Sequence, residues 1–220
     1  MASLVYHAGR LTVRILLFLF TRCQVRGREN IPSQGPLLVV ANHLHLADPP
    51  LIGVSLGRKV IFMAKEELFR GRLSGYVIRS FGAFPVHRGQ VDRQALRQAE
   101  KILAEGSALV IFPEATRSQN AQLQPAFPGS ALIALRSGAP ILPVAITGTE
   151  KIRGISWLLR RPQITLHIGL PFHLPPVDGK SSKERLTELT DFIMEHIAKL
   201  LPVEYRGHYM QVGKSDGIKD

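Results

Sequence analysis

The sequence predicts an α/β domain in which a sheet is flanked by helices. Short apolar runs typical of buried strands recur along the chain, and segments with helical periodicity separate them. The chain has 220 residues, 45% of them hydrophobic and 20% charged, which suits one globular domain with a sizeable core. Strands are predicted over residues 37–40, 60–64, 109–112, 141–146 and 164–168.

The first residues predict a helix that lies on a membrane surface. Polar residues recur at spacings of four, three and four, which places Ser3, His7, Arg10 and Arg14 on one helical face. Most other side chains are apolar, but the uninterrupted apolar run, 15–20, is too short for a membrane span, and no signal-peptide cleavage site follows. We expect residues 1–24 to lie in the bilayer interface. The alternative is a first helix packed on the protein core.

The remaining helices are predicted from apolar periodicity and from their end signals. They cover residues 49–56, 65–80, 92–105, 129–136 and 183–200. Asp92 can cap the third of these, and Ser181 to Glu184 matches a capping box before the last. Residues 26–36 read as a connector. We therefore expect a helix over 1–24, a globular domain over 25–205 and a flexible tail over 206–220.

The formal net charge of +11 indicates an anionic partner. Nucleic acid is a poor fit, because the sequence has no zinc-finger spacing and no basic run interleaved with aromatic residues. An anionic membrane surface and phosphorylated small molecules remain. The single cysteine, Cys23, excludes an intramolecular disulfide framework.

One polar loop suggests acid–base chemistry. The apolar run 37–40 is followed by His43 and then by Asp48, which directly precedes Pro49 and Pro50. Proline favours the first helical turn and aspartate favours the N-cap, so we expect a strand, a tight loop and a helix. On a continuous helix, residues five apart point about 140° away from each other. A loop that folds back could instead bring imidazole and carboxylate within hydrogen-bond reach, as a base and its orienting group.

Two more polar clusters follow strand-like segments, where the loops of α/β sheets form sites. Arg88 ends the extended segment 82–89, and Glu114 with Arg117 follows the strand 109–112. Guanidinium groups suit phosphate because their planar fork makes paired hydrogen bonds. Glu114 could hold an arginine or accept a substrate hydroxyl, and a structural ion pair with Arg117 is the rival interpretation.

No covalent nucleophile is evident, since the G-x-S-x-G elbow is missing. A His-Asp pair without a serine suggests that the substrate brings the hydroxyl. His45, two residues from His43, raises the question of a metal, but the other ligands are not clustered in sequence and we expect none. His45 is expected to be structural or to form a pocket wall.

These residues resemble the ordered motifs of the glycerolipid acyltransferases, and most of all the bacterial 1-acyl-glycerol-3-phosphate acyltransferases. The motifs are Asn42-His43 with Asp48 (HxxxxD), residues 82–88, Phe112 to Ser118, and 141–144. Together they span about residues 25–170. Two positions depart from the family pattern: Ala115 stands where a glycine is usual, and Phe127 stands where relatives often carry lysine.

The resemblance implies a glycerol-3-phosphate acyltransferase-like fold, a mixed, mostly parallel sheet docked on the membrane by the N-terminal helix. It implies His43 as the base and Asp48 as its orienting residue. It also implies that Arg88, Glu114, Thr116 and Arg117 bind the acceptor. No cofactor is expected beyond the acyl donor, which is acyl-CoA or acyl carrier protein. The enzyme would be peripheral or monotopic on the cytoplasmic face of the cell membrane.

The implied reaction moves a fatty acyl group from the thioester to the free hydroxyl of 1-acyl-glycerol-3-phosphate and makes phosphatidic acid. Alternatives are acylation of glycerol 3-phosphate or another lysolipid, and hydrolysis of acyl thioesters by the same His-Asp pair. A third is a non-catalytic basic membrane binder, in which the N-terminal helix carries the function.

Overall fold

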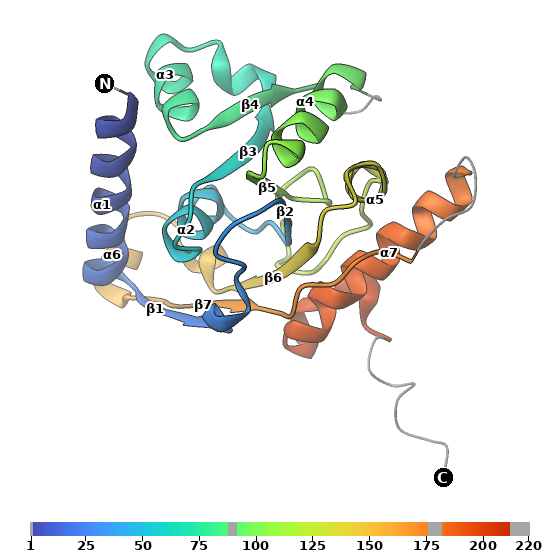
Figure 1. Ribbon diagram of the computed structural model, residues 1–220. Helices are drawn as coiled ribbons and strands as arrows, with labels where there is room; N and C mark the ends of the chain where they lie inside the picture. Colours follow the sequence, from blue (N-terminus) through green and yellow to red (C-terminus); the bar gives the residue numbers. More distant parts are fainter. Residues whose placement is uncertain (1, 88–91, 176–181, 212–220) are drawn as a thin grey trace.

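The computed structural model describes residues 2–87, 92–175 and 182–211, and it confirms the α/β class (Figure 1). Their strands form one sheet in the order β1-β7-β6-β2-β5-β3-β4. Neighbouring strands are parallel, except that β6 and β7 are antiparallel, so the sheet is mixed and mostly parallel, as predicted. The strands are β1 (Arg22–Arg26), β2 (Leu37–Ala41), β3 (Val60–Lys65), β4 (Ala83–Val86), β5 (Ala108–Ile111), β6 (Ile141–Thr147) and β7 (Gln163–Ile168).

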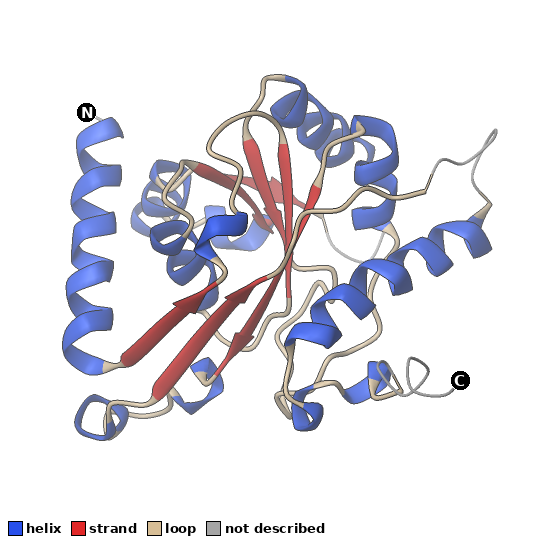
Figure 2. Ribbon diagram, turned by 60° about the horizontal axis from the view of Figure 1, so that its bottom comes forward, coloured by secondary structure: helices blue, strands red, loops and turns tan. Residues whose placement is uncertain are grey.

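Helices cover both faces of the sheet, as Figure 2 shows. The central strand β2 is buried along its whole length because its alternating side chains enter two separate cores. Leu38 and Val40 pack with α4, α5 and α7, whereas Leu37 and Val39 pack with α2 and the inner side of α1. The helices are α1 (Ala2–Phe20), α2 (Asp48–Ser55), α3 (Arg72–Ser80), α4 (Arg93–Ala104), α5 (Gly129–Ser137), α6 (Trp157–Arg160) and α7 (Lys183–Leu200).

One edge of the sheet gathers the loops that matter for function. Strands β2 to β6 all run in the same direction, so their carboxyl ends meet at this edge, which we call the carboxyl edge. Because β7 is antiparallel to β6 and β1 is parallel to β7, β1 and β7 begin at the carboxyl edge. The C-terminal end of α1, which precedes β1, and α6, which precedes β7, therefore also lie there.

Several elements of the structure differ from the sequence prediction. Residues Arg22–Arg26 form an edge strand, which was not predicted. The predicted helix 65–80 is instead a short 3₁₀ helix, Glu66–Phe69, followed by α3. The N-cap of α7 is Ser182, one position later than the capping box predicts, and Ser181 lies outside the described residues.

Both ends of the described chain are held by the domain. Tyr6 of α1 is buried and packs edge-on against Phe81. At the other end, Tyr209 is buried and its hydroxyl donates to Asp191 (2.9 Å), so residues 206–211 of the expected tail pack on the domain. Within the described residues, no helix combines the length and apolar character needed to cross a bilayer.

Candidate active site

The loop after β2 folds back as predicted and pairs His43 with Asp48. The Nδ1 atom of His43 lies 2.8 Å from Oδ2 of Asp48. The same carboxylate oxygen accepts the backbone N–H groups of Leu44 and His45, each at 2.7 Å. Asp48 is the first residue of α2, with both prolines in the first turn, and it bonds the loop rather than capping its own helix. One carboxylate thus fixes both the loop backbone and the imidazole.

This contact also fixes the proton on the imidazole. An ionised carboxylate can only accept hydrogen bonds, so Nδ1 of His43 carries the hydrogen and Nε2 keeps its lone pair. The ring stacks on Phe112, with centroids 4.2 Å apart, and only 9% of the side chain is exposed. Asp48 is fully buried, and its Oδ1 has no hydrogen-bond partner among the described residues. The arrangement suits His43 as a base whose orientation is fixed by the buried carboxylate of Asp48.

Two further buried side chains hold the backbone on either side of this pair. Asn42 donates its amide hydrogen to the carbonyl oxygen of Ile146 (2.9 Å) and accepts the N–H of Ile146 (2.7 Å). Glu114 accepts the N–H of His43 at Oε1 and the N–H of Gln124 at Oε2, both at 2.9 Å. Backbone groups therefore occupy both carboxylate oxygens of Glu114, and the rival ion pair with Arg117 is not formed between these two described residues.

Burial dominates the titration of Glu114, of which 1% is exposed. It raises the pKa of this carboxyl to about 7, against the opposing effect of the two N–H donors. Asp48 nearby raises the pKa further. Glu114 is thus a buried group whose charge changes near neutral pH while it holds the backbone of the candidate base.

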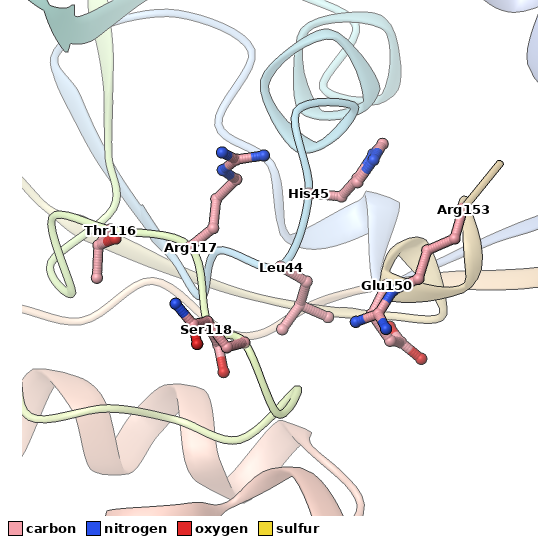
Figure 3. A pocket seen from close by; sticks show the side chains of 8 residues that line it. Leu44, His45, Thr116, Arg117, Ser118, Glu150 and Arg153 are labelled. Carbon is pink, nitrogen blue, oxygen red and sulfur yellow. The ribbon is translucent and has the colours of Figure 1, made fainter.

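A cavity of about 320 Å³ opens beside this loop at the carboxyl edge. Three loops build it, as Figure 3 shows: the loop after β2, the loop after β5 and the segment after β6. Its lining includes Leu44, His45, Thr116, Arg117, Glu150 and Arg153. His45, expected to be structural or a pocket wall, lines the cavity, and its Nδ1 accepts the N–H of Ala47 (3.2 Å).

Two arginines, Arg117 and Arg153, line the cavity. Both side chains are exposed, and within the described part of the chain neither guanidinium has a hydrogen bond or an ion pair. Their charge affects His45, whose pKa is lowered chiefly by burial and further by Arg117 and Arg153, against the opposite effect of Asp48. Unpaired guanidinium groups on a concave surface are suited to an anion.

The other predicted residues are distributed as follows. Thr116 and Arg117 line the cavity, while Glu114 lies behind His43. Arg88 lies outside the described residues; the preceding His87 contacts Asp92 (3.0 Å) and Glu66. No group of three or more His, Cys, Asp or Glu side chains within residues 2–87, 92–175 and 182–211 gathers closely enough to hold a metal ion.

Arg153 and Glu150 are cavity residues that sequence reasoning missed. Both follow β6 at the carboxyl edge. The rule that selected Arg88 and Glu114, a polar cluster after a strand, applies equally to the residues after 141–146 and would have found them. Glu150 is held in place by Tyr205, whose hydroxyl donates to its Oε1 (2.8 Å).

Comparisons with known proteins agree with the motifs. A family model described as Acyltransferase matches residues 22–147. A 1-acyl-sn-glycerol-3-phosphate acyltransferase of Bacillus subtilis is 29% identical over 189 residues, which cover 86% of this chain and 92% of that protein. A lyso-ornithine lipid O-acyltransferase of Pseudomonas aeruginosa is 35% identical over 127 residues, 56% of this chain and 47% of that protein. The crystal structure of the 1-acyl-sn-glycerophosphate acyltransferase PlsC from Thermotoga maritima matches with a TM-score of 0.66 at 31% identity, covering 90% of this chain and 79% of that one.

Proposed function

Because this chain belongs to the acyltransferase family, we propose that it transfers a fatty acyl group to the free hydroxyl of 1-acyl-glycerol-3-phosphate and makes phosphatidic acid. One observation carries the proposal: His43, paired with Asp48, directly precedes Leu44 and His45, which line a cavity whose two guanidinium groups have no partner among the described residues. The pair supplies the base that acyl transfer needs, and the guanidinium groups match the phosphate of the acceptor.

The acyl group moves directly from the thioester to the acceptor hydroxyl, without an acyl-enzyme intermediate. Nε2 of His43 takes the proton of the acceptor hydroxyl as its oxygen attacks the thioester carbonyl carbon. The C–S bond then breaks, and the leaving thiolate takes the proton from His43, so the products are phosphatidic acid and a free thiol. Asp48 stabilises the imidazolium that forms between these steps.

The acceptor is held by its phosphate. Arg117 and Arg153 bind the phosphate oxygens, and the hydroxyl of Thr116 adds a neutral hydrogen bond. Arg88 is included as a further phosphate-binding cation, and only the sequence motif supports this role. Glu114, expected to bind substrate, has a positioning role in this proposal, because both of its oxygens bond backbone N–H groups.

The donor is an acyl thioester of coenzyme A or acyl carrier protein, and no further cofactor takes part. The acceptor is a lipid, so the enzyme works at a membrane as a peripheral or monotopic protein, on the cytoplasmic face where these carriers are found. Support comes from α1, whose exposed face carries Leu11, Ile15, Leu16, Phe18 and Leu19. Its inner face packs on the domain, and in this proposal its exposed face lies in the bilayer interface.

An acceptor panel tests this function. Purified protein is incubated with acyl-CoA or acyl carrier protein thioester and with lysophosphatidate, glycerol 3-phosphate, lyso-ornithine lipid or no acceptor. We expect transfer to lysophosphatidate to be fastest, and His43→Ala to reduce it by about 10²–10⁴-fold without loss of fold. Fatty acid released equally fast without an acceptor would identify a hydrolase, and a folded His43→Ala variant with normal turnover would remove the base assignment.

A further inference from the structure

A second element adds exposed apolar side chains next to α1. The segment around α6 carries Ile155, which is 83% exposed, and Leu159, which is 91% exposed. Phe18, near the C-terminal end of α1, is 77% exposed. Figure 1 shows α6 beside this end of α1, and the two helices are in contact. Apolar side chains this exposed, on neighbouring elements, mark an interaction surface.

The two elements are joined rigidly. The rings of Phe20 and Trp157 meet edge-on with centroids 6.1 Å apart. Arg161 donates from Nη2 to the carbonyl oxygen of Phe18 (2.9 Å), and Arg22 donates from Nε to the carbonyl oxygen of Arg161 (3.1 Å). These contacts hold the two elements side by side, and we call their exposed apolar side chains the docking surface: Leu11, Ile15, Phe18, Leu19, Ile155 and Leu159.

The charges around the docking surface fit an anionic bilayer. The stretches 2–28 and 151–177, which include both helices, contain no aspartate or glutamate. They contribute exposed cations beside the apolar side chains, among them Arg14 and Arg160. Apolar side chains flanked by arginines alone match the acyl and headgroup layers of a membrane that holds anionic lipid. A protein partner on this surface would have to supply both an apolar face and the acidic groups for these arginines, whereas an anionic bilayer has both.

One end of the docking surface follows a residue that lines the cavity. Ile155 is two residues after Arg153, which lines the cavity, and both follow β6 at the carboxyl edge. The loop after β2 contributes an exposed apolar residue, Leu46, directly after the lining residue His45. A membrane against this edge would offer an acceptor phosphate to Arg117 and Arg153 while the acyl chain stays in the lipid.

We propose that the α6 segment is a second membrane anchor, which enters an anionic lipid bilayer together with α1 and turns the cavity toward it. The proposal rests on the proposed function for the identity of the lipid acceptor. The contact between α6 and the bilayer does not depend on turnover, so it can be measured separately.

The chain has a single tryptophan, Trp157, and it lies in α6. Its fluorescence therefore reports on this segment alone. We expect a blue shift when the protein is mixed with equimolar phosphatidylcholine and phosphatidylglycerol vesicles, and quenching when the phosphatidylcholine carries brominated chains. His43→Ala should respond in the same way. Protein that sediments with the vesicles while the emission of Trp157 stays unshifted and unquenched would overturn the proposal.

Two matched double variants complete the test. Ile155→Gln/Leu159→Gln should lower the vesicle partition coefficient by about 30-fold, because two apolar side chains leave the lipid. Leu170→Gln/Val203→Gln removes two exposed apolar side chains from outside the docking surface and should change the partition coefficient by less than about twofold. Equal partitioning of both variants would refute the second anchor.

Activity separates the two proposals. With a short-chain lysophosphatidate in free solution, both double variants should turn over like the unmodified enzyme. With lysophosphatidate in vesicles, only Ile155→Gln/Leu159→Gln should be slower, by at least about tenfold. If neither the unmodified enzyme nor a double variant acylates any acceptor, the proposed function fails while the fluorescence result stands. Equal rates of both double variants on vesicles would contradict the orienting role of α6.

Discussion

The base and the cations of the site are built in opposite ways. The base loop buries Asn42, His43 and Asp48, and Asp48, Asn42 and Glu114 each hold a backbone group by a hydrogen bond. The guanidinium groups of Arg117 and Arg153 are exposed and unpaired within the described residues. A base must already be in position when the hydroxyl arrives, whereas a phosphate supplies the partners that order an arginine. The difference predicts that substitutions in the base loop lower kcat or stability, and that substitutions of the cations raise KM.

The largest effect is expected at Asp48. Asp48→Asn keeps a carbonyl oxygen for the three N–H donors but removes the charge that stabilises the imidazolium. We expect kcat to fall at least about 100-fold with little change in stability. Asp48→Ala also removes the acceptor and leaves two backbone N–H groups buried without a partner, so unfolding by urea should show a further loss of about 3–5 kcal/mol. A folded Asp48→Asn variant with normal kcat would show that the charge is not used.

Glu114 should make stability depend on pH. Its pKa is raised from the unfolded value of 4.5 to about 7, so between these values the native state holds a proton that the unfolded state has lost. The free energy of unfolding should therefore fall as pH rises through this window, by about 3 kcal/mol in all from this group. Glu114→Gln should remove that slope, measured by urea unfolding at pH 5 and pH 8.

The control for this experiment is Glu188→Gln, which alters an exposed carboxylate on α7 and should leave the slope unchanged. A Glu114→Gln variant with the slope of the unmodified protein would mean that the carboxyl titrates at its ordinary pKa despite its burial.

Substitutions of Arg117 and Arg153 test whether the exposed cations act in substrate binding. Arg117→Gln and Arg153→Gln should each raise the KM for lysophosphatidate about tenfold, because each variant loses one charge-assisted hydrogen bond to the phosphate. The kcat should stay within about twofold of the unmodified enzyme. The KM for acyl-CoA should not change. The control is Arg136→Gln, which removes a guanidinium paired with Glu100 on the α4–α5 side of the sheet. A kcat effect without a KM effect at Arg153 would place this residue in the chemistry rather than in binding.

The same contrast explains what the sequence could predict. The His43–Asp48 pair was predictable because its signals are local: a strand, a five-residue spacing and two prolines. The orientation of Glu114 was not, because its donors lie 71 and ten residues away and are backbone groups that any sequence carries. Strand β1 was missed for a related reason: Arg22–Arg26 has no apolar run, and only pairing with β7 makes it a strand.

The smallest effect is expected at Ala115, one of the two positions that depart from the family pattern. The motif that this segment resembles has glycine at this position, and the backbone of Ala115 has a φ of 55°, the left-handed region in which a side chain is strained. Ala115→Gly relieves that strain but adds backbone entropy to the unfolded chain, so we expect a net gain of about 0.5–1 kcal/mol in urea unfolding. Ala104→Gly, at the end of α4 with ordinary helical backbone, should instead lose stability. If both variants are destabilised alike, the loop after β5 does not impose the left-handed conformation, and Ala115 is no poorer a residue there than glycine.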